Sequence, residues 1–295
     1  MIAEIAVKIQ CELGEGPVWS RQHQTICWVD ILKGEIHQYD TLKMHLYTLS
    51  LHTMIGAIAI CKSGRFIAAM QEGIGFVNRL DGKVEIIAHP ELKLSKNRFN
   101  DGKCDPEGRF WIGTMAINES TAAGNLYTLD QYFHVERKIA NTTISNGLAW
   151  SPDEQKFYYI DTPTMKVIAY KYNKEQNEIS MPSAAVTIGK EDGYPDGMTI
   201  DSEGMLWIAH WNGWQVTRWN PETGRKLLAV KLPVANVSSV VFGGADLQDL
   251  YITTTRKGLS HQQLEDQPLA GSLFVVKNCG YRGLKAFEFN DEQSD

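Results

Sequence analysis

Two stretches of the chain decide its fold: NDGKCDPEGRFWIGT at residues 100–114 and PDGMTIDSEGMLWIAH at residues 195–210. In each stretch a polar residue is followed five positions later by Asp, and then by a short turn and a run of aromatic and β-branched residues. A third copy, NGLAWSPDEQKFYYID, occupies residues 146–161 with Ser in place of the Asp. Aromatic and β-branched runs favour strands, and Gly, Asn and Asp favour tight turns. The stretches therefore predict a recurring strand–turn–strand unit.

The same unit runs through the whole chain as six copies. We call the position that begins each copy its anchor, and the six anchors are Glu15, Ile58, Asn100, Asn146, Asp196 and Ser239. Successive anchors are 43, 42, 46, 50 and 43 residues apart. A repeat of about 40–50 residues that contains several short strands is typical of the blade of a β-propeller. The strand-like run at residues 2–9 can close the last blade, which removes an open sheet edge.

The sequence thus predicts an all-β fold, a six-bladed β-propeller with four antiparallel strands in each blade. We expect a single catalytic domain at residues 1–289, followed by a frayed, polar C-terminal tail at residues 290–295. A seventh blade would require another full repeat, which a chain of 295 residues with this spacing does not hold.

Composition and charge narrow the classes of function. The chain has 43% hydrophobic and 22% charged residues, as ordinary soluble globular proteins do. Its formal net charge of −6 supplies no basic field for a phosphate backbone, so we expect no nucleic-acid partner. We also expect no membrane association, because the longest clean apolar run has 7 residues, at 54–60, and a membrane helix needs about 20. The oligomeric state is left open.

The cysteines indicate the compartment. The chain has five, widely spaced and without a CxxC pair: Cys11, Cys27, Cys61, Cys104 and Cys279. Isolated cysteines of this kind are usually reduced and buried in the core of the protein. Because the N-terminus lacks the apolar run of a signal peptide, the sequence predicts a cytoplasmic protein.

Four of the six anchors carry groups that can bind a cation: Glu15, Asn100, Asn146 and Asp196. Equal positions in the repeat predict equal positions in the ring, so we expect all six anchors to surround one mouth of the central channel. Buried carboxylates without a counter-charge are costly, and no anchor is Lys or Arg. Oxygen ligands suit Ca²⁺, Mg²⁺ or Mn²⁺, whereas Zn²⁺ prefers His or Cys. The alternative is that these residues only form turns, which Asn and Asp favour.

At these residues the chain resembles the senescence marker protein/regucalcin and gluconolactonase family. The matching stretches spread over nearly the full chain in the family's order: LGEGPVW at 13–19, NRFNDGKCDPEGRFWIGTM at 97–115, SNGLAWSPD at 145–153, FYYID at 157–161, PDGMTIDSEGMLWIA at 195–209 and VSSVVFGG at 237–244. The resemblance implies a six-bladed propeller, in agreement with the repeat. It also implies a gluconolactonase-like enzyme that hydrolyses sugar lactones with one divalent metal ion, and Ca, Zn, Mn and Mg all stay open.

The resemblance further implies roles for individual residues. Glu15, Asn146 and Asp196 match the family's metal-binding residues, and Asp196 also matches its proton-transfer residue. Arg98 and Asn100 match residues that hold the sugar lactone. We therefore expect the small-molecule substrate to lie at the channel mouth, between these two groups of residues.

Two more residues are candidate contacts to the substrate. After GTMA some animal relatives carry two glutamates, one of which contacts the substrate, whereas this chain has Ile117 and Asn118. Asn118 follows a strand that ends at the same mouth as the anchors, so it is a candidate contact, with a solvated loop as the alternative. Trp211 also faces this mouth, where it can stack on a sugar face or simply pack against its neighbours.

Two alternatives to a lactonase stay open. A calcium-dependent aryl ester or phosphotriester hydrolase can use the same fold and an oxygen-ligated ion, and turnover of paraoxon against that of a lactone would separate the two. A non-enzymatic calcium-binding propeller would bind the ion and hydrolyse neither compound.

Overall fold

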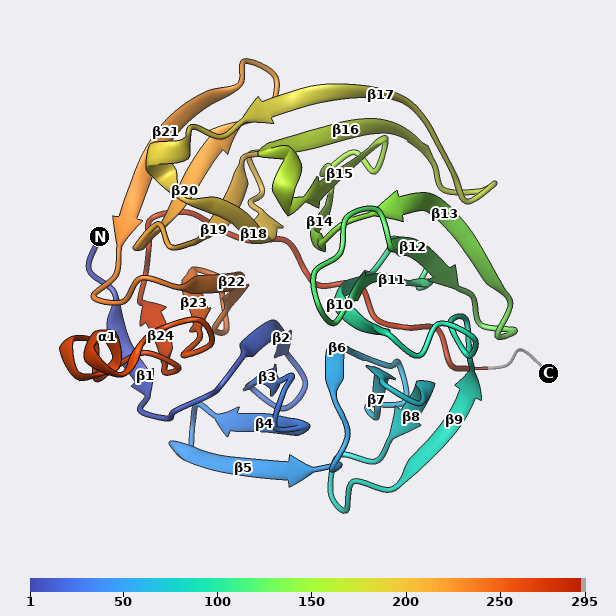
Figure 1. Ribbon diagram of the computed structural model, residues 1–295, viewed down its shortest axis with the longest axis horizontal. Helices are drawn as coiled ribbons and strands as arrows, with labels where there is room; N and C mark the ends of the chain where they lie inside the picture. Colours follow the sequence, from blue (N-terminus) through green and yellow to red (C-terminus); the bar gives the residue numbers. More distant parts are fainter. Residues whose placement is uncertain (293–295) are drawn as a thin grey trace.

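The chain forms a closed ring of six sheets in the computed structural model, which describes residues 1–292 (Figure 1). Each sheet has four strands, and every pair of neighbouring strands is antiparallel. The protein is therefore a six-bladed β-propeller, as the spacing of the repeat predicted.

The strands fall into four classes by their distance from the central channel. The innermost strands of blades 1–6 are β2 (Gly14–Ser20), β6 (Ile55–Ile60), β10 (Asn97–Cys104), β14 (Ser145–Trp150), β18 (Tyr194–Ile200) and β22 (Val237–Gly243). The second strands are β3 (Thr25–Asp30), β7 (Phe66–Met70), β11 (Phe110–Ala116), β15 (Lys156–Asp161), β19 (Leu206–Trp211) and β23 (Asp249–Thr254).

The outer half of each blade completes the set. The third strands are β4 (Glu35–Asp40), β8 (Gly73–Val77), β12 (Gly124–Leu129), β16 (Lys166–Asn173), β20 (Gln215–Asn220) and β24 (Leu273–Val276). The outermost strands are β5 (His45–Ser50), β9 (Val84–Ala88), β13 (Val135–Thr142), β17 (Glu178–Thr187), β21 (Arg225–Lys231) and β1 (Glu4–Val7).

The ring closes where the N-terminal strand joins the last blade. β1 pairs with β24 and supplies the fourth strand of blade 6, with Glu4 opposite Val275. The prediction that the N-terminal run closes the last blade is confirmed. Because β1 is the outermost strand of blade 6, this pairing joins the first and last repeats of the ring by backbone hydrogen bonds.

Burial falls from the axis to the rim. All six residues of β3 are buried, whereas β5 at the rim of the same blade has no buried residue. The apolar side chains meet between neighbouring blades rather than at one centre; Ile67 of blade 2 and Phe110 of blade 3, for example, share one cluster. Continuous burial on both faces explains why the second strands read as unbroken aromatic and β-branched runs.

Helical structure is confined to connections. The described residues contain two 3₁₀ turns, η1 (Thr162–Thr164) and η2 (Lys190–Asp192), and one short α-helix, α1 (His261–Asp266). The side chain of Ser260 caps α1 and accepts a hydrogen bond from Gln263 N. Within residues 1–292, no helix has the length and apolar character to cross a membrane.

The innermost strands are irregular at their anchors. The pairing of β2 with β3 shifts between Glu15 and Val18, and that of β14 with β15 shifts between Asn146 and Leu148. Such β-bulges insert an unpaired residue, bend the strand and re-aim its side chains. The irregularity therefore turns the anchor side chains toward the axis at one end of each strand.

The predicted position of the anchor in blade 2 is wrong. Cys61 N donates to Arg65 O, just as Asp105 N donates to Arg109 O in blade 3, so Cys61 rather than Ser63 takes the place of Asp105. Five residues before Cys61 stands Gly56, and the prediction of Ile58 as anchor is wrong by two positions. A Cβ atom at Gly56 would lie 2.4 Å from the carbonyl carbon of Phe99, so only glycine fits between these two strands.

The chain after β24 crosses the face of the ring opposite the anchors; we call residues 277–291 the strap. It passes from blade 6 toward the edge of blades 2 and 3 (Figure 1). Ser202 N donates to Arg282 O, and the backbone of Phe289 exchanges hydrogen bonds with Ile60 and Lys62. Because these partners lie at or beyond the far ends of the innermost strands, the strap covers the second mouth of the channel.

The strap keeps its contacts beyond the expected end of the domain at residue 289. Asn290 N donates to Gly108 O, and the carboxylate of Asp291 accepts hydrogen bonds from Ser63 and Arg65. These two residues of the expected tail are therefore held in place, while residues 293–295 of that tail lie outside the described part of the chain.

Candidate active site

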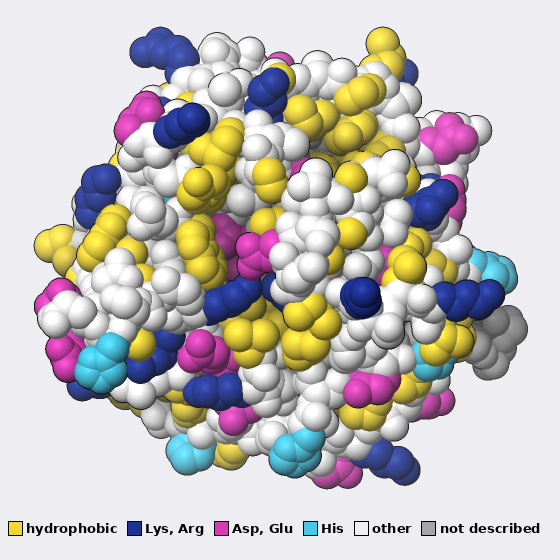
Figure 2. Space-filling view, in the orientation of Figure 1, with side chains coloured by type: hydrophobic (Ala, Val, Ile, Leu, Met, Phe, Trp, Pro, Cys, Tyr) yellow, Lys and Arg dark blue, Asp and Glu magenta, His cyan; other side chains and the backbone are white. Residues whose placement is uncertain are grey.

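The four polar anchors line one cavity of about 270 Å³ at the mouth of the channel. Glu15, Asn100, Asn146 and Asp196 come from β2, β10, β14 and β18, whose bulged ends meet at the axis. Figure 2 shows this face of the molecule, where acidic and basic side chains gather near the centre. Four non-adjacent stretches of the sequence are thus brought together by the repeat, as expected.

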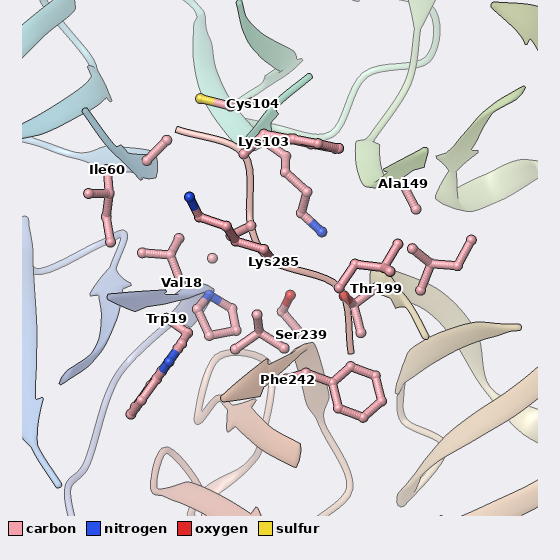
Figure 3. Close-up of a pocket in the computed structure, with 18 of the residues that line it drawn as sticks. Val18, Trp19, Ile60, Lys103, Cys104, Ala149, Thr199, Ser239, Phe242 and Lys285 are labelled. Atoms are coloured by element: carbon pink, nitrogen blue, oxygen red, sulfur yellow. The ribbon is translucent and has the colours of Figure 1, made fainter. Parts of the chain in front are cut away.

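The other two predicted anchors lie elsewhere. Ile58 and Ser239 line a second, deeper cavity of about 100 Å³ rather than the mouth. Figure 3 shows Ser239 at this deeper cavity, with the strap residue Lys285 running along it. The expected ring of six anchors is therefore correct for four. For Ile58 the cause is the two-residue offset in blade 2.

Two buried carboxylates face the mouth cavity without a direct ion-pair partner. Glu15 and Asp196 are 6% and 5% exposed, and no Lys, Arg or His of the described residues lies within 4 Å of either. Burial, the Asp196 charge and the nearby Asp101 carboxylate raise the pKa of Glu15 well above its usual range. Burial and Asp101 likewise raise the pKa of Asp196. The site thus favours an added positive charge.

This donor set fits a hard divalent cation. Glu15 Oε2 accepts a hydrogen bond from Gly16 N at 3.1 Å, which leaves its other oxygen free, and Asp196 accepts no side-chain hydrogen bond. Among residues 1–292 no three His, Cys, Asp or Glu side chains converge on one point. A metal would therefore rest on two carboxylates and amide oxygen, the hard ligands that Ca²⁺, Mg²⁺ and Mn²⁺ accept.

The amide of Asn146 is oriented by a hydrogen-bond chain. Thr162 Oγ1 donates to Pro195 O at 2.8 Å. Since the single hydroxyl proton is used there, Oγ1 can only accept from Asn146 Nδ2, also at 2.8 Å. The NH₂ group of Asn146 is thereby turned toward Thr162 and its oxygen toward Asn100 and the cavity. Thr162 thus presents the amide atom that a cation needs.

Arg98 and Asn100 form a second hydrogen-bonded group beside the carboxylates. Asn100 Nδ2 donates to Ser145 O at 2.8 Å and to Asn146 Oδ1 at 2.9 Å, and its oxygen accepts from Arg98 Nη1 at 2.7 Å. Burial lowers the pKa of Arg98 to about 10, against the opposing effect of Glu15, so the guanidinium stays charged at neutral pH. It is the buried positive group of this cavity, and its remaining N–H groups can donate to a ligand.

The two further candidate contacts, Trp211 and Asn118, lie in different surroundings. Trp211, half-buried at the end of β19, lines the mouth cavity as expected. Asn118 does not: it is exposed, and its Oδ1 accepts hydrogen bonds from Ser120 N at 3.2 Å and Ser120 Oγ at 2.7 Å. The next residue, Glu119, lines the cavity in its place.

Among the residues that line the cavity, Glu119, Thr162 and Lys257 carry polar groups that the sequence did not predict there. Glu119 has a φ of 61°, a left-handed conformation that a sequence does not reveal for a glutamate and that decides which side chain of its turn faces inward. Thr162 follows the run FYYID directly, a position that repeat comparison could have flagged. Lys257 lies in the connection after β23, where no repeat pattern exists.

Comparison with known proteins gives one consistent result. The family described as SMP-30/Gluconolactonase/LRE-like region matches residues 13–256. Regucalcin of Bos taurus is 36% identical over 291 residues, which cover 97% of each chain. A solved structure of luciferin-regenerating enzyme superposes with a TM-score of 0.91 at 31% identity, over 98% of this chain and 99% of that one.

A bacterial structure agrees. Regucalcin of Agrobacterium tumefaciens, described as a calcium-binding protein, superposes with a TM-score of 0.91 at 25% identity, over 98% of this chain and 97% of that one. The shared sequence includes the region that carries all four polar anchors, and the shared fold extends over the complete ring. The chain therefore belongs to the SMP-30/gluconolactonase/LRE-like family.

Proposed function

We propose that this protein is a metal-dependent hydrolase that opens sugar lactones, such as gluconolactone, to the corresponding sugar acids. The observation that carries the proposal is the pair of buried carboxylates, Glu15 and Asp196, that face a cavity of about 270 Å³ without a direct counter-charge. The membership of a family that includes gluconolactonases supports the substrate class.

Glu15, Asn146 and Asp196 would hold the divalent ion, which is Ca, Zn, Mn or Mg. When bound, the ion would polarise the ring carbonyl of the lactone and stabilise the negative charge that develops on its oxygen. Asn146 is suited to this role because Thr162 aims its amide oxygen into the cavity.

Asp196 would move the proton. Hydrolysis of a lactone requires that a water molecule lose a proton as it attacks the carbonyl carbon, and that the ring oxygen gain one as the ester bond breaks. A carboxylate within hydrogen-bond reach of both oxygens can do both. Asp196 lines the cavity and has no side-chain donor of its own, so its oxygens are available to water and substrate.

Arg98 and Asn100 would hold the substrate. The guanidinium is fixed by Phe99 O at 3.0 Å and by Asn100 Oδ1 at 2.7 Å, which limits its motion and leaves its other donors for sugar oxygens. Trp211 would cover one face of the sugar ring. A contact between Asn118 and the substrate stays a prediction, which the position of Asn118 outside the cavity does not support.

The five cysteines support a cytoplasmic location, because all are buried free thiols and none forms a disulfide. The cavity volume of about 270 Å³ suits a small molecule.

A substrate and metal panel tests the proposal. Chelator-treated protein would be assayed with D-glucono-1,5-lactone and with paraoxon, with and without added Ca²⁺, Zn²⁺, Mn²⁺ or Mg²⁺, against a blank for spontaneous hydrolysis. We expect turnover of the lactone that requires one of the ions. Preferred turnover of paraoxon would assign the protein to the ester and phosphotriester hydrolases, and tight metal binding without turnover of either compound would make it a non-enzymatic binding protein.

A further inference from the structure

A salt bridge crosses the mouth of the cavity. Lys257 Nζ lies 3.0 Å from Glu119 Oε1, and both side chains line the cavity that holds the anchors. Glu119 belongs to the connection between β11 and β12 in blade 3, and Lys257 follows β23 in blade 6. These blades stand on opposite sides of the ring (Figure 1). The pair therefore joins two opposite blades at the cavity that Glu15 and Asp196 also line.

Backbone hydrogen bonds, in addition to the salt bridge, fix the position of Lys257. Lys257 N donates to Glu12 O at 2.9 Å and to Thr255 Oγ1 at 3.1 Å, and Lys257 O accepts from Asn236 Nδ2 at 2.9 Å. The ammonium group extends from this fixed backbone, and only one of its three N–H groups is used, on Glu119. Two donors and the second oxygen of Glu119 are left for a ligand.

A stabilising role does not account for this pair. The side chains of Lys257 and Glu119 are 32% and 50% exposed, and salt bridges of such exposure contribute about 0–1 kcal/mol to stability. Its geometry is instead that of a recognition element: a donor and an acceptor lie side by side, which matches a hydroxyl group, because a hydroxyl both accepts and donates.

We propose that Lys257 is a specificity-determining residue that contacts the hydroxyl groups of the substrate at the end remote from the lactone carbonyl, with Glu119 as its positioning residue. The inference rests on the proposed function. With the carbonyl at Glu15 and Asp196, the opposite end of the sugar lies against the salt bridge at the mouth. A ligand without hydroxyl groups displaces water from the pair and offers no hydrogen bond in return.

The test compares two substrates in each variant. We expect Lys257→Met to lower the ratio of kcat/KM for D-glucono-1,5-lactone to kcat/KM for δ-valerolactone about tenfold, the usual effect of one lost hydrogen bond to a charged group. The loss should be mainly in KM for the hydroxylated substrate. Lys257→Arg should recover part of the ratio, and Glu119→Gln should lower it less than Lys257→Met does.

A matched control removes a comparable ion pair away from the cavity. Lys156 pairs with Glu222 at 2.6 Å, with side chains 42% and 64% exposed, and Lys156→Met should leave the ratio unchanged. Thermal unfolding of each variant separates a loss of fold from a loss of recognition, and Lys257→Arg and Glu119→Gln carry the test if Lys257→Met does not fold.

The outcomes separate this inference from the function on which it rests. If the wild-type protein hydrolyses neither lactone with any ion, the proposed function fails. If the wild-type protein hydrolyses both and the Lys257 variants leave the ratio unchanged, or lower both activities equally, the recognition role of Lys257 is overturned while the lactonase function stands.

Discussion

At the level of single residues, the repeat locates the four polar anchors but not the orientation of their side chains. Glu15, Asn100, Asn146 and Asp196 could be predicted because each lies in the first half of the innermost strand of its blade, so their equal positions in the repeat become neighbouring positions at the axis. The orientation of the Asn146 amide could not be predicted. It depends on Thr162, 16 residues further along the chain, and on the carbonyl group of Pro195 in the next blade.

Thr162 provides a test of this orientation. Thr162→Val removes the hydroxyl that accepts from Asn146 Nδ2 and donates to Pro195 O, so the amide loses its preferred orientation. We expect the affinity for the divalent ion, measured by calorimetry on chelator-treated protein, to fall about tenfold, the effect of losing about one hydrogen bond. Thr162→Ser keeps the hydroxyl and should restore the affinity. Equal affinities of Thr162→Val and the wild type would show that Thr162 does not orient the ligand.

The raised pKa values of Glu15 and Asp196 predict a pH dependence of the metal-free protein. The folded state favours the protonated carboxyl groups more than the unfolded state does. The stabilisation is therefore complete below the unfolded pKa values and is lost as pH rises through the raised, folded ones. We expect the free energy of unfolding of the metal-free protein to fall as pH rises above the unfolded carboxyl pKa values of about 4 and through the raised, folded ones. Denaturant titrations at several pH values measure it.

Glu15→Gln is the control for this pH dependence. The variant removes one of the two carboxylates, so it should flatten the slope and stabilise the metal-free protein at neutral pH by about 1 kcal/mol, as relief of a strained functional site often does. A saturating divalent ion should reverse the order and favour the wild type. An identical pH slope in Glu15→Gln and the wild type would contradict the account.

At the level of strands and turns, a buried aspartate joins neighbouring blades. Asp105, at the turn after β10, accepts hydrogen bonds from Trp111 Nε1 at 2.9 Å in its own blade and from Tyr172 OH at 2.7 Å in blade 4. Arg109 Nε lies 3.1 Å from the same carboxylate. The equivalent Asp201 repeats the bond to a tryptophan, with Trp207 Nε1 at 2.9 Å. The recurring Asp in the repeat therefore marks a structural position, distinct from the anchors.

Asp105→Ala tests this structural role. The substitution leaves a buried tryptophan N–H, a tyrosine hydroxyl and an arginine without their acceptor, so we expect a loss of about 3–5 kcal/mol in the free energy of unfolding. Asp81→Ala, at an exposed turn whose carboxylate accepts only from Lys83 N, should change it by less than about 0.5 kcal/mol. Similar losses in both variants would contradict the role of Asp105.

The turns also show where sequence reasoning fails. In blade 2 the run ICKSGRF offers both Cys61 and Ser63 as the first residue of the turn, and only the backbone bond from Cys61 to Arg65 decides between them. In blade 3 the conformation of Glu119 places its side chain, instead of that of Asn118, at the cavity. Strand positions follow the repeat, whereas loop residues depend on backbone angles that their sequence does not specify.

At the level of the whole molecule, the ring could be predicted and the strap could not. Six repeats of similar length fix the number of blades, and the N-terminal strand-like run predicts the closure that β1 and β24 make. The strap contains only isolated backbone bonds and no regular strand, so no periodicity reveals it. It covers the mouth of the channel that lies opposite the anchors.

Phe289 tests the contribution of the strap to stability. Its side chain is completely buried in the cluster between blades 2 and 3, so Phe289→Ala should lower the free energy of unfolding by about 3–5 kcal/mol through the cavity that it leaves. Tyr132→Ala, which removes a 64% exposed aromatic ring, is the matched control and should have little effect. A stability of Phe289→Ala equal to that of the control would show that the strap does not hold the ring together.

The most direct test of the central claim is the turnover of D-glucono-1,5-lactone by Asp196→Asn, which keeps the size of the side chain but removes its proton-accepting carboxylate. The assay uses chelator-treated protein that is reloaded with a saturating divalent ion, with spontaneous hydrolysis subtracted. We predict that the wild type regains its activity with the ion, and that folded Asp196→Asn stays about 100-fold or more below it. Activity of Asp196→Asn near that of the wild type, or wild-type activity that survives the chelator unchanged, would contradict the account.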